Sequence, residues 1–345
     1  MKRFVPILLS LAVLLPAFSG CGDQSGAAAS PTPASEAGAG AALAEAPTAT
    51  EAPVLTPRAF TADRYLLSAD AAAYLGNARD DYAALIDAVC AGAPEAQLSG
   101  YESAALAAEV FAESPYSALA GLEIAENGAV TITPAGSGSA EEFDSAAELL
   151  VEGAVYAESN ELETAVSLYR AVSAGCTYAE SGENSLYRMI VEQEGGNAEF
   201  AAALCYLFNQ NGIAARIASG TAGDTEHRWV IAELGGQPYH FDPTFENSAT
   251  GGRGLSYFGM SDAARIYTGC ALPCTAGRGG YAETLGAPCP DTHFDEFFTD
   301  VTSWDCDVRA HFLYLAYGFE TEYLNSIETG LQSTAEQGEI AVQAE

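Results

Sequence analysis

The sequence contains almost no lysine. Its 345 residues include 13 Lys and Arg together against 47 Asp and Glu, a formal net charge of −34, and the only lysine is Lys2. So few cations cannot form the basic patch that nucleic-acid phosphates require. We therefore expect no nucleic-acid partner, and we interpret the acidic surface as one that keeps the protein in solution.

Long apolar runs are also missing after the N-terminus, so no membrane-spanning helix is expected there. The chain starts with Lys2 and Arg3, continues with an apolar stretch from 4 to 18, and then reads Ser19-Gly20-Cys21. This order is typical of a secretory signal. Because a cysteine follows the small pair, the site resembles a bacterial lipobox, although Phe18 stands where leucine is usual. We expect a lipidated Cys21 that anchors the protein to the outer face of the cell membrane.

Composition divides the rest of the chain. Ala, Pro, Gly and Ser dominate the stretch after Cys21, which cannot bury a core and is expected to be a disordered tether. The predicted organisation is a signal peptide and lipobox (1–21), a tether (22–57), an N-terminal α/β region (58–150), a main domain (151–300), and a C-terminal helix with a disordered tail (301–345).

The N-terminal region mixes helices with a hairpin. Apolar residues at helical spacing around Tyr82 and Val89 predict one helix, and a second is expected to end near Pro115. Alternating apolar residues on both sides of Asn127-Gly128 predict a β-hairpin.

The main domain carries the informative motifs. A helix is predicted to begin at Asn197 after Gly195-Gly196, with Phe200, Leu204 and Phe208 on one side. Downstream, "HRWVIAEL" and "QPYHFDPTF" are two predicted strands joined by Gly235-Gly236.

The predicted hairpin places two polar residues together. If Leu234 pairs with Gln237, His227 and Asp242 lie on one face as diagonal neighbours, and His240 shares that face. An aspartate that holds one imidazole nitrogen raises the basicity of the other, as in the base half of a nucleophilic triad.

Together these motifs resemble the transglutaminase-like family. Phe200-Ala201, Gly212-Ile213, His227-x-Trp229 and "DPTF" from Asp242 follow the family pattern in order and spacing, and "LSYFGMSDAARIYTG" is similar to the segment after the aspartate in bacterial lipoprotein members. The resemblance implies an α+β fold with a papain-like core, a helix packed on an antiparallel sheet, after a small mixed region. It also implies a Cys-His-Asp triad that needs no cofactor.

The residue at the nucleophile position is Asn197 rather than cysteine. The family chemistry uses cysteine there because a helix N-terminus lowers the pKa of a thiol and supplies N–H groups to an oxyanion. Asparagine offers no thiolate, but it is a favoured N-cap residue. His227 and Asp242 match the other two triad positions, and the resemblance places Trp229 and Tyr178 in the binding cleft.

Two other cysteines are candidate substitutes for the missing nucleophile. Cys205 lies eight residues along the same helix, about 12 Å from its start at 1.5 Å per residue, among apolar neighbours. Cys176 precedes the upstream helix, close to Tyr178. Neither provides the helix-start environment that activates a thiol.

Metal and disulfide alternatives also remain open. His227, His240 and Asp242 on one face could hold a metal that activates water for hydrolysis. Four late cysteines are compatible with disulfides, which an exported chain favours, or with zinc through Cys270-x3-Cys274 and Cys289-x3-His293. The fourth of them is Cys306. We expect no bound metal.

The sequence thus predicts a surface-anchored, non-catalytic domain that binds a peptide, a protein or peptidoglycan in its residual cleft. The alternatives are an active peptidase or acyl transferase that uses another thiol, and a metal-assisted hydrolase.

Overall fold

The computed structural model describes residues 56–295, except 137, 180–184, 253, 277–283 and 287. Cys21 and the expected signal peptide, Cys306 and the expected C-terminal helix lie outside the described residues, and so does nearly all of the expected tether. None of the helices in the described part is long and apolar enough to cross a membrane.

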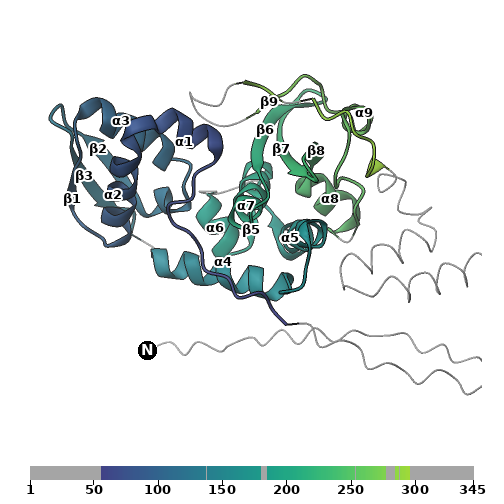
Figure 1. Cartoon of the computed structure of the whole chain (residues 1–345), viewed down its shortest axis with the longest axis horizontal. Helices are drawn as coiled ribbons and strands as arrows, with labels where there is room; N and C mark the ends of the chain where they lie inside the picture. The colour runs from purple at the N-terminus through teal and green to yellow at the C-terminus, as the bar shows by residue number, and fades with distance from the viewer. Residues whose placement is uncertain are drawn as a thin grey trace, which may run out of the picture. The chain divides into compact units, whose positions relative to one another are not determined.

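The first part of the described chain forms three helices and a small sheet (Figure 1). The helices are α1 (Ala69–Leu75), α2 (Arg79–Cys90) and α3 (Tyr101–Phe111), with the 3₁₀ turns η1 (Gly76–Ala78) and η2 (Pro115–Leu119). The antiparallel sheet has the order β1 (Glu95–Gln97), β3 (Ala129–Pro134) and β2 (Ala120–Ile124). Its β2–β3 hairpin turns at Asn127-Gly128, as the sequence predicts, with Gly128 at a φ of 81°.

Four helices follow: α4 (Ala140–Ala154), α5 (Glu161–Gly175), α6 (Leu186–Val191) and α7 (Asn197–Gln210). The buried side of α7 includes Phe200, Leu204 and Phe208, the spacing seen in the sequence. Two short parallel strands, β4 (Thr177–Tyr178) and β5 (Glu194–Gly195), bring the end of α5 next to the start of α7. The α7 helix packs against β6 and β7 of the larger sheet.

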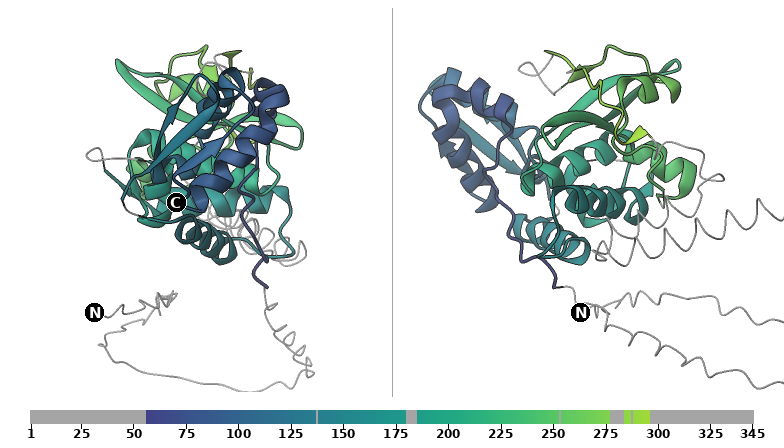
Figure 2. Two further views of the ribbon diagram at one scale, coloured as in Figure 1. Left: turned by 90° about the vertical axis from the view of Figure 1, so that its left-hand side faces the viewer. Right: turned by 45° about the vertical axis from the view of Figure 1, so that its right-hand side comes forward.

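The larger sheet has five antiparallel strands in the order β10-β9-β6-β7-β8. They are β6 (Ala215–Ala222), β7 (Thr225–Leu234), β8 (Gln237–Phe241), β9 (Thr275–Ala276) and β10 (Thr284–Leu285). The teal helices lie along the green strands in the right-hand view of Figure 2. Helices packed on an antiparallel sheet confirm the predicted α+β class and its papain- or transglutaminase-like core.

The β7–β8 hairpin has the predicted register. Leu234 pairs with Gln237 across Gly235-Gly236, and the pairing continues to Val230 opposite Phe241. Helix α8 (Pro243–Thr250) starts directly after β8, and α9 (Asp262–Tyr267) follows a short loop. The end of β8 therefore delivers Asp242 to the first turn of a helix.

Candidate functional site

The hairpin brings His227 and Asp242 into direct contact. Nε2 of His227 lies 2.6 Å from Oδ2 of Asp242, and both residues are buried. The predicted contact between them is therefore present. An imidazole that donates Nε2–H to a carboxylate keeps Nδ1 as its acceptor nitrogen. No other described residue forms a hydrogen bond with that nitrogen.

Asp242 has two further partners. Its Oδ1 accepts a hydrogen bond from the backbone N–H of Phe245 at 2.9 Å and so caps α8. Its Oδ2 lies 2.8 Å from Nη2 of Arg265. Burial by itself raises the pKa of Asp242, but the Arg265 charge and the His227 hydrogen bond outweigh it, and the pKa falls below its usual value. The carboxylate is therefore ionised at neutral pH.

Arg265 was not predicted from the sequence to belong to the site. Its side chain is fully buried, and its guanidinium lies 4.3 Å from the ring centroid of Trp229 and 5.3 Å from that of Phe245. A buried cation needs a counter-ion and profits from aromatic faces, and this site provides both. The feature of the sequence that could have indicated its role is the presence of a basic residue within "SDAARIYTG" in a strongly acidic chain.

Aromatic rings enclose the imidazole of His227. Phe245, which follows the Asp-Pro-Thr motif, stacks on it with ring centroids 4.3 Å apart, and Trp229 stacks at 6.1 Å. Only 5% of the His227 surface is exposed. The rings fix the orientation of the imidazole, and they therefore also fix the direction in which Nδ1 of His227 points.

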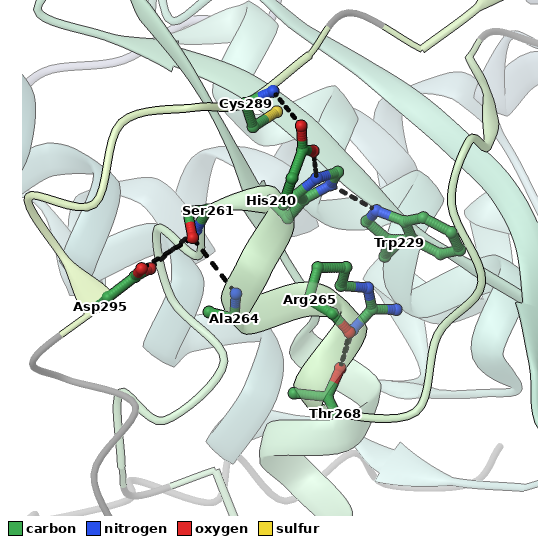
Figure 3. A network of polar contacts seen from close by, with 9 residues as sticks. Trp229, His240, Ser261, Ala264, Arg265, Thr268, Cys289 and Asp295 are labelled. Carbon is green, nitrogen blue, oxygen red and sulfur yellow. Dashed lines mark hydrogen bonds and ion pairs between the residues drawn. The ribbon is translucent and has the colours of Figure 1, made fainter.

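Trp229 is fully buried and links His227 to a second histidine, His240. Figure 3 shows the hydrogen bond between Trp229 and His240. Its indole N–H donates to Nδ1 of His240 at 2.9 Å, and Nε2 of His240 lies 2.9 Å from Oδ1 of Asp262. Burial lowers the pKa of His240 to about 4, although the hydrogen bond to Asp262 opposes this effect. His240 is therefore neutral at pH 7 and donates Nε2–H to Asp262.

This arrangement is unfavourable for a metal. Among the described residues, the one group of suitable ligand atoms belongs to His240, Asp262 and Cys289, within 4.8 Å of one another. Coordination through Nε2 would require Nδ1 to carry the proton, and Trp229 already donates to Nδ1. The expected alternative set of His227, His240 and Asp242 does not form such a group, because His240 faces Asp262 instead.

Asn197 is the first residue of α7, and its side chain is half-buried. The N-cap is Gly196 rather than Asn197, so the expected capping role is wrong. Glu199 replaces it, since its carboxylate accepts a hydrogen bond from the Gly196 N–H at 3.0 Å. The Asn197 amide has no hydrogen-bond partner among the residues the structure describes, so the fold does not use it.

Tyr178 lies beside the start of α7. It pairs with Gly195 in the two-stranded sheet, and its ring centroid is 6.3 Å from that of Phe200. The side chain is one of the larger hydrophobic groups that remain exposed, at 37%. It therefore offers an aromatic surface next to the position that a nucleophile would occupy.

The substitute thiols are not activated. Burial raises the pKa of both Cys176 and Cys205 to about 12, so neither is a thiolate at neutral pH. Cys270, Cys274 and Cys289 are buried, and no disulfide joins them to one another within the described chain. His293, the fourth residue of the zinc spacing, is exposed and does not join their ligand group.

A buried carboxylate, which was also not predicted from the sequence, stabilises the segment that follows Asp242. Glu246 of α8 accepts hydrogen bonds from Tyr169, Thr250 and the backbone of Tyr257. Tyr169 also donates to the backbone oxygen of Asp242 at 3.1 Å. Burial raises the pKa of Glu246 despite these bonds. The network holds the segment after β8 in place.

Comparison with known proteins agrees with this geometry. Residues 148–243 match the model of the transglutaminase-like superfamily, a range that includes Tyr178, Asn197, His227 and Asp242. This segment is a transglutaminase-like domain. Arg265 and α9 lie beyond the matched range.

Two solved structures are similar to part of this chain. A proposed cysteine protease from Cytophaga hutchinsonii shares 23% identity over 29% of this chain and 37% of its own length, with a TM-score of 0.26. A TGase shares 14% identity over 36% of this chain and 43% of its own, with a TM-score of 0.27. The chain thus spans less than half of either structure. No curated protein matches it.

Proposed function

We propose that this protein is an exported, lipid-anchored transglutaminase-like domain that binds peptide or cell-wall material without turning it over. The observation that carries the proposal is the unused amide of Asn197 at the first residue of α7, where the family chemistry needs a thiolate. The histidine and aspartate of the triad are retained and in contact. The domain thus keeps the histidine and the aspartate of the triad and lacks the nucleophile.

Arg265 provides a second argument against catalysis. Its guanidinium lies 2.8 Å from the same Asp242 oxygen that contacts His227. In a working triad the aspartate charge stabilises the imidazolium that forms during the reaction. A cation on that oxygen offsets part of the charge on which this stabilisation depends.

Three groups of the proposed cleft suit peptide binding. The Asn197 amide can donate and accept hydrogen bonds, as a peptide backbone requires. Tyr178 adds an exposed aromatic face, and Nδ1 of His227 is an acceptor without a partner in the described chain. Aromatic faces next to unpaired polar groups are typical of binding sites.

The anchoring part of the proposal rests on the N-terminal sequence. Ser19-Gly20-Cys21 follows an apolar stretch that is too short to span a membrane comfortably, and a tether without core-forming residues extends to about 57. A lipid on Cys21 would hold the domain on the outer face of the cell membrane. Membrane lipid and cell-wall peptide are then its partners.

The test compares wild type with Asn197→Cys and with Asn197→Cys/His227→Ala for incorporation of a labelled amine and for peptide hydrolysis. We expect an inactive wild type, an Asn197→Cys variant that exceeds background by at least about a hundredfold, and loss of that gain in the double variant. A wild type that turns over substrate and loses activity on alkylation or in His227→Ala would refute the proposal.

A further inference from the structure

A cavity of about 150 Å³ lies between the first part of the described chain and the second half of α7. It is lined by parts of the segment 63–71, by α2, α3 and η2, and by α6, α7 and β6. Asn197, Tyr178 and His227 are not among its lining residues. The cavity is therefore separate from the candidate site, and the proposed function gives it no role.

The sequence of α7 explains why this space is open. Ala202, Cys205, Tyr206 and Asn209 all line the cavity. Their spacing of i, i+3, i+4 and i+7 places them on one face of the helix. The large core residues of α7, such as Phe200, lie on a different face. The cavity thus meets a face of α7 that carries small and polar residues.

The cavity extends from an exposed rim to a buried floor. Leu66 at the rim is 38% exposed, whereas Tyr82, Val110 and Ala202 are buried. A ligand can therefore enter from solvent and lose most of its contact with water once inside. An apolar cavity of about 150 Å³ holds one benzene molecule in another protein. This size indicates a ligand of about one ring.

The arginines of the lining have counter-ions. Arg64 forms an ion pair with Asp144 at 2.5 Å, and Arg216 lies 3.6 Å from Asp70. Neither guanidinium is thus available to hold an anion, and Glu113 takes part in an interaction of its own. Because an unpaired charge is costly to transfer out of water, the cavity favours an uncharged ligand.

The hydroxyl group of Tyr206 lacks a partner. Its oxygen is buried and forms no hydrogen bond with any residue that the structure describes. The ring packs edge-on against Phe143, with centroids 5.4 Å apart, which fixes the position of the hydroxyl. A buried polar group without a partner costs free energy, and a ligand that forms a hydrogen bond with it removes this cost.

A second phenol lines the same cavity. Tyr82 of α2 is buried, and its hydroxyl forms no hydrogen bond within the described chain. Burial raises the pKa of both Tyr82 and Tyr206, so both hydroxyls keep their protons at neutral pH and can act as donors. Two unpaired donors favour a ligand with a hydrogen-bond acceptor, such as a carbonyl oxygen.

We propose that this cavity binds a small, uncharged, single-ring compound that carries a carbonyl group. The ring would pack on Leu67, Val110 and Ala202, and the carbonyl oxygen would accept a hydrogen bond from Tyr206. The inference goes beyond the proposed function and does not depend on it. It requires no covalent step.

The test follows the NMR signals of isotope-labelled alanine methyl groups in the full chain during titration. The probes are acetophenone, ethylbenzene, which has the ring without the carbonyl, and benzoate, which is charged. We expect acetophenone to shift the Ala202 signal and to bind at least about fivefold more tightly than ethylbenzene, because of one added hydrogen bond. Benzoate should bind at least about tenfold more weakly than acetophenone, because its charge must leave water.

Tyr206→Phe tests the hydrogen bond, since it keeps the ring and removes the hydroxyl. We expect the preference for acetophenone over ethylbenzene to fall below about twofold, with the affinity for ethylbenzene not weakened. Tyr101→Phe is the matched control, because Tyr101 of α3 is 52% exposed and does not line the cavity. It should keep the full preference.

Ala202→Leu tests the location, since the longer side chain fills the cavity. We expect it to weaken the binding of acetophenone and ethylbenzene alike, by about fivefold or more. Ala249→Leu makes the same change at an exposed position of α8 and should leave both affinities unchanged. If Ala202→Leu does not fold, the comparison of Tyr206→Phe with Tyr101→Phe still decides the question.

No binding of acetophenone, as expected of a cavity that holds only water, would overturn the inference. Equal affinities for acetophenone and ethylbenzene, an unchanged preference in Tyr206→Phe, or unchanged binding in a folded Ala202→Leu would do the same. Benzoate that binds as tightly as acetophenone would refute the uncharged class. The activity of Asn197→Cys tests the proposed function separately, and neither result decides the other.

Discussion

At the scale of single residues, Asp242 has three structural tasks at once. It holds Nε2 of His227, neutralises the buried Arg265 and caps α8 through Phe245. Removing its carboxylate would leave a buried guanidinium without a counter-ion, which typically costs several kcal/mol. Loss of function in an Asp242 variant would therefore report on folding as much as on chemistry. Substitutions at Asn197 address the chemistry more cleanly.

His240 predicts a measurable pH dependence. Burial lowers its pKa to about 4 from an ordinary value of 6.5, with Arg265 adding to the shift and Asp262 opposing it. Between these pH values the unfolded chain binds more protons than the folded protein, so the free energy of unfolding falls as the pH drops from 6.5 to 4. In His240→Gln we expect this fall to shrink by up to about 3 kcal/mol.

Urea unfolding at several pH values between 4 and 7 measures the effect of His240. His293→Gln is the control, because His293 is exposed. Glu246, whose raised pKa acts in the opposite direction, is unchanged in both variants. Stability curves with the same slope in wild type and His240→Gln would contradict the prediction.

At the scale of elements, the β7–β8 hairpin determines the site. Its two-residue turn has Gly235 at a φ of 58° and Gly236 at 75°, both in the left-handed region that other residues avoid. A shift of one residue in this pairing would move His227 to the opposite face of the sheet. The position of the imidazole therefore depends on a turn at the other end of the strand.

Gly236→Ala tests this turn. No atom would contact an added Cβ within 4 Å, so the cost comes from the backbone conformation alone. We expect a loss of about 1–2 kcal/mol in the free energy of unfolding. Gly236→Asn should lose clearly less, because asparagine tolerates this region. Chemical denaturation measures both variants, and equal losses would argue against conformational strain.

The sequence predicts the local part of this arrangement and misses the long-range part. The hairpin register follows from Gly235-Gly236 and strand alternation, and it is enough to place His227 against Asp242. The N-cap at Asn197 was one residue off, because Glu199 bonds back to Gly196. Arg265 was missed because its place depends on how the chain returns after α8, which no local pattern encodes. His240 was placed on the correct face, but its partners Trp229 and Asp262 depend on tertiary packing.

At the scale of the whole molecule, one sign of charge dominates. The full chain carries a formal net charge of −34. Some arginines of the described part, such as Arg64 and Arg188, form ion pairs with specific carboxylates. Most acidic side chains therefore repel one another across the surface, and this repulsion opposes the compact state.

Added salt should screen the repulsion between the acidic side chains and so weaken it. Between about 0.01 and 1 M salt the Debye length falls from about 30 to 3 Å. We expect the thermal midpoint of the full-length protein to rise by several degrees over this range of NaCl. A neutral osmolyte at equal osmolality separates screening from solute exclusion. A midpoint that stays constant or falls in NaCl would contradict the prediction.

The setting of Trp229 gives the site an optical readout. The protein has only two tryptophans, Trp229 and Trp304, and the indole of Trp229 is sealed from water between the Arg265 guanidinium and the imidazoles. Its emission spectrum depends on the charges beside the ring and on the acceptor of its N–H, which is His240. With Trp304 replaced by phenylalanine, the colour and intensity of tryptophan fluorescence would report events at His227, Asp242 and Arg265 without an added dye.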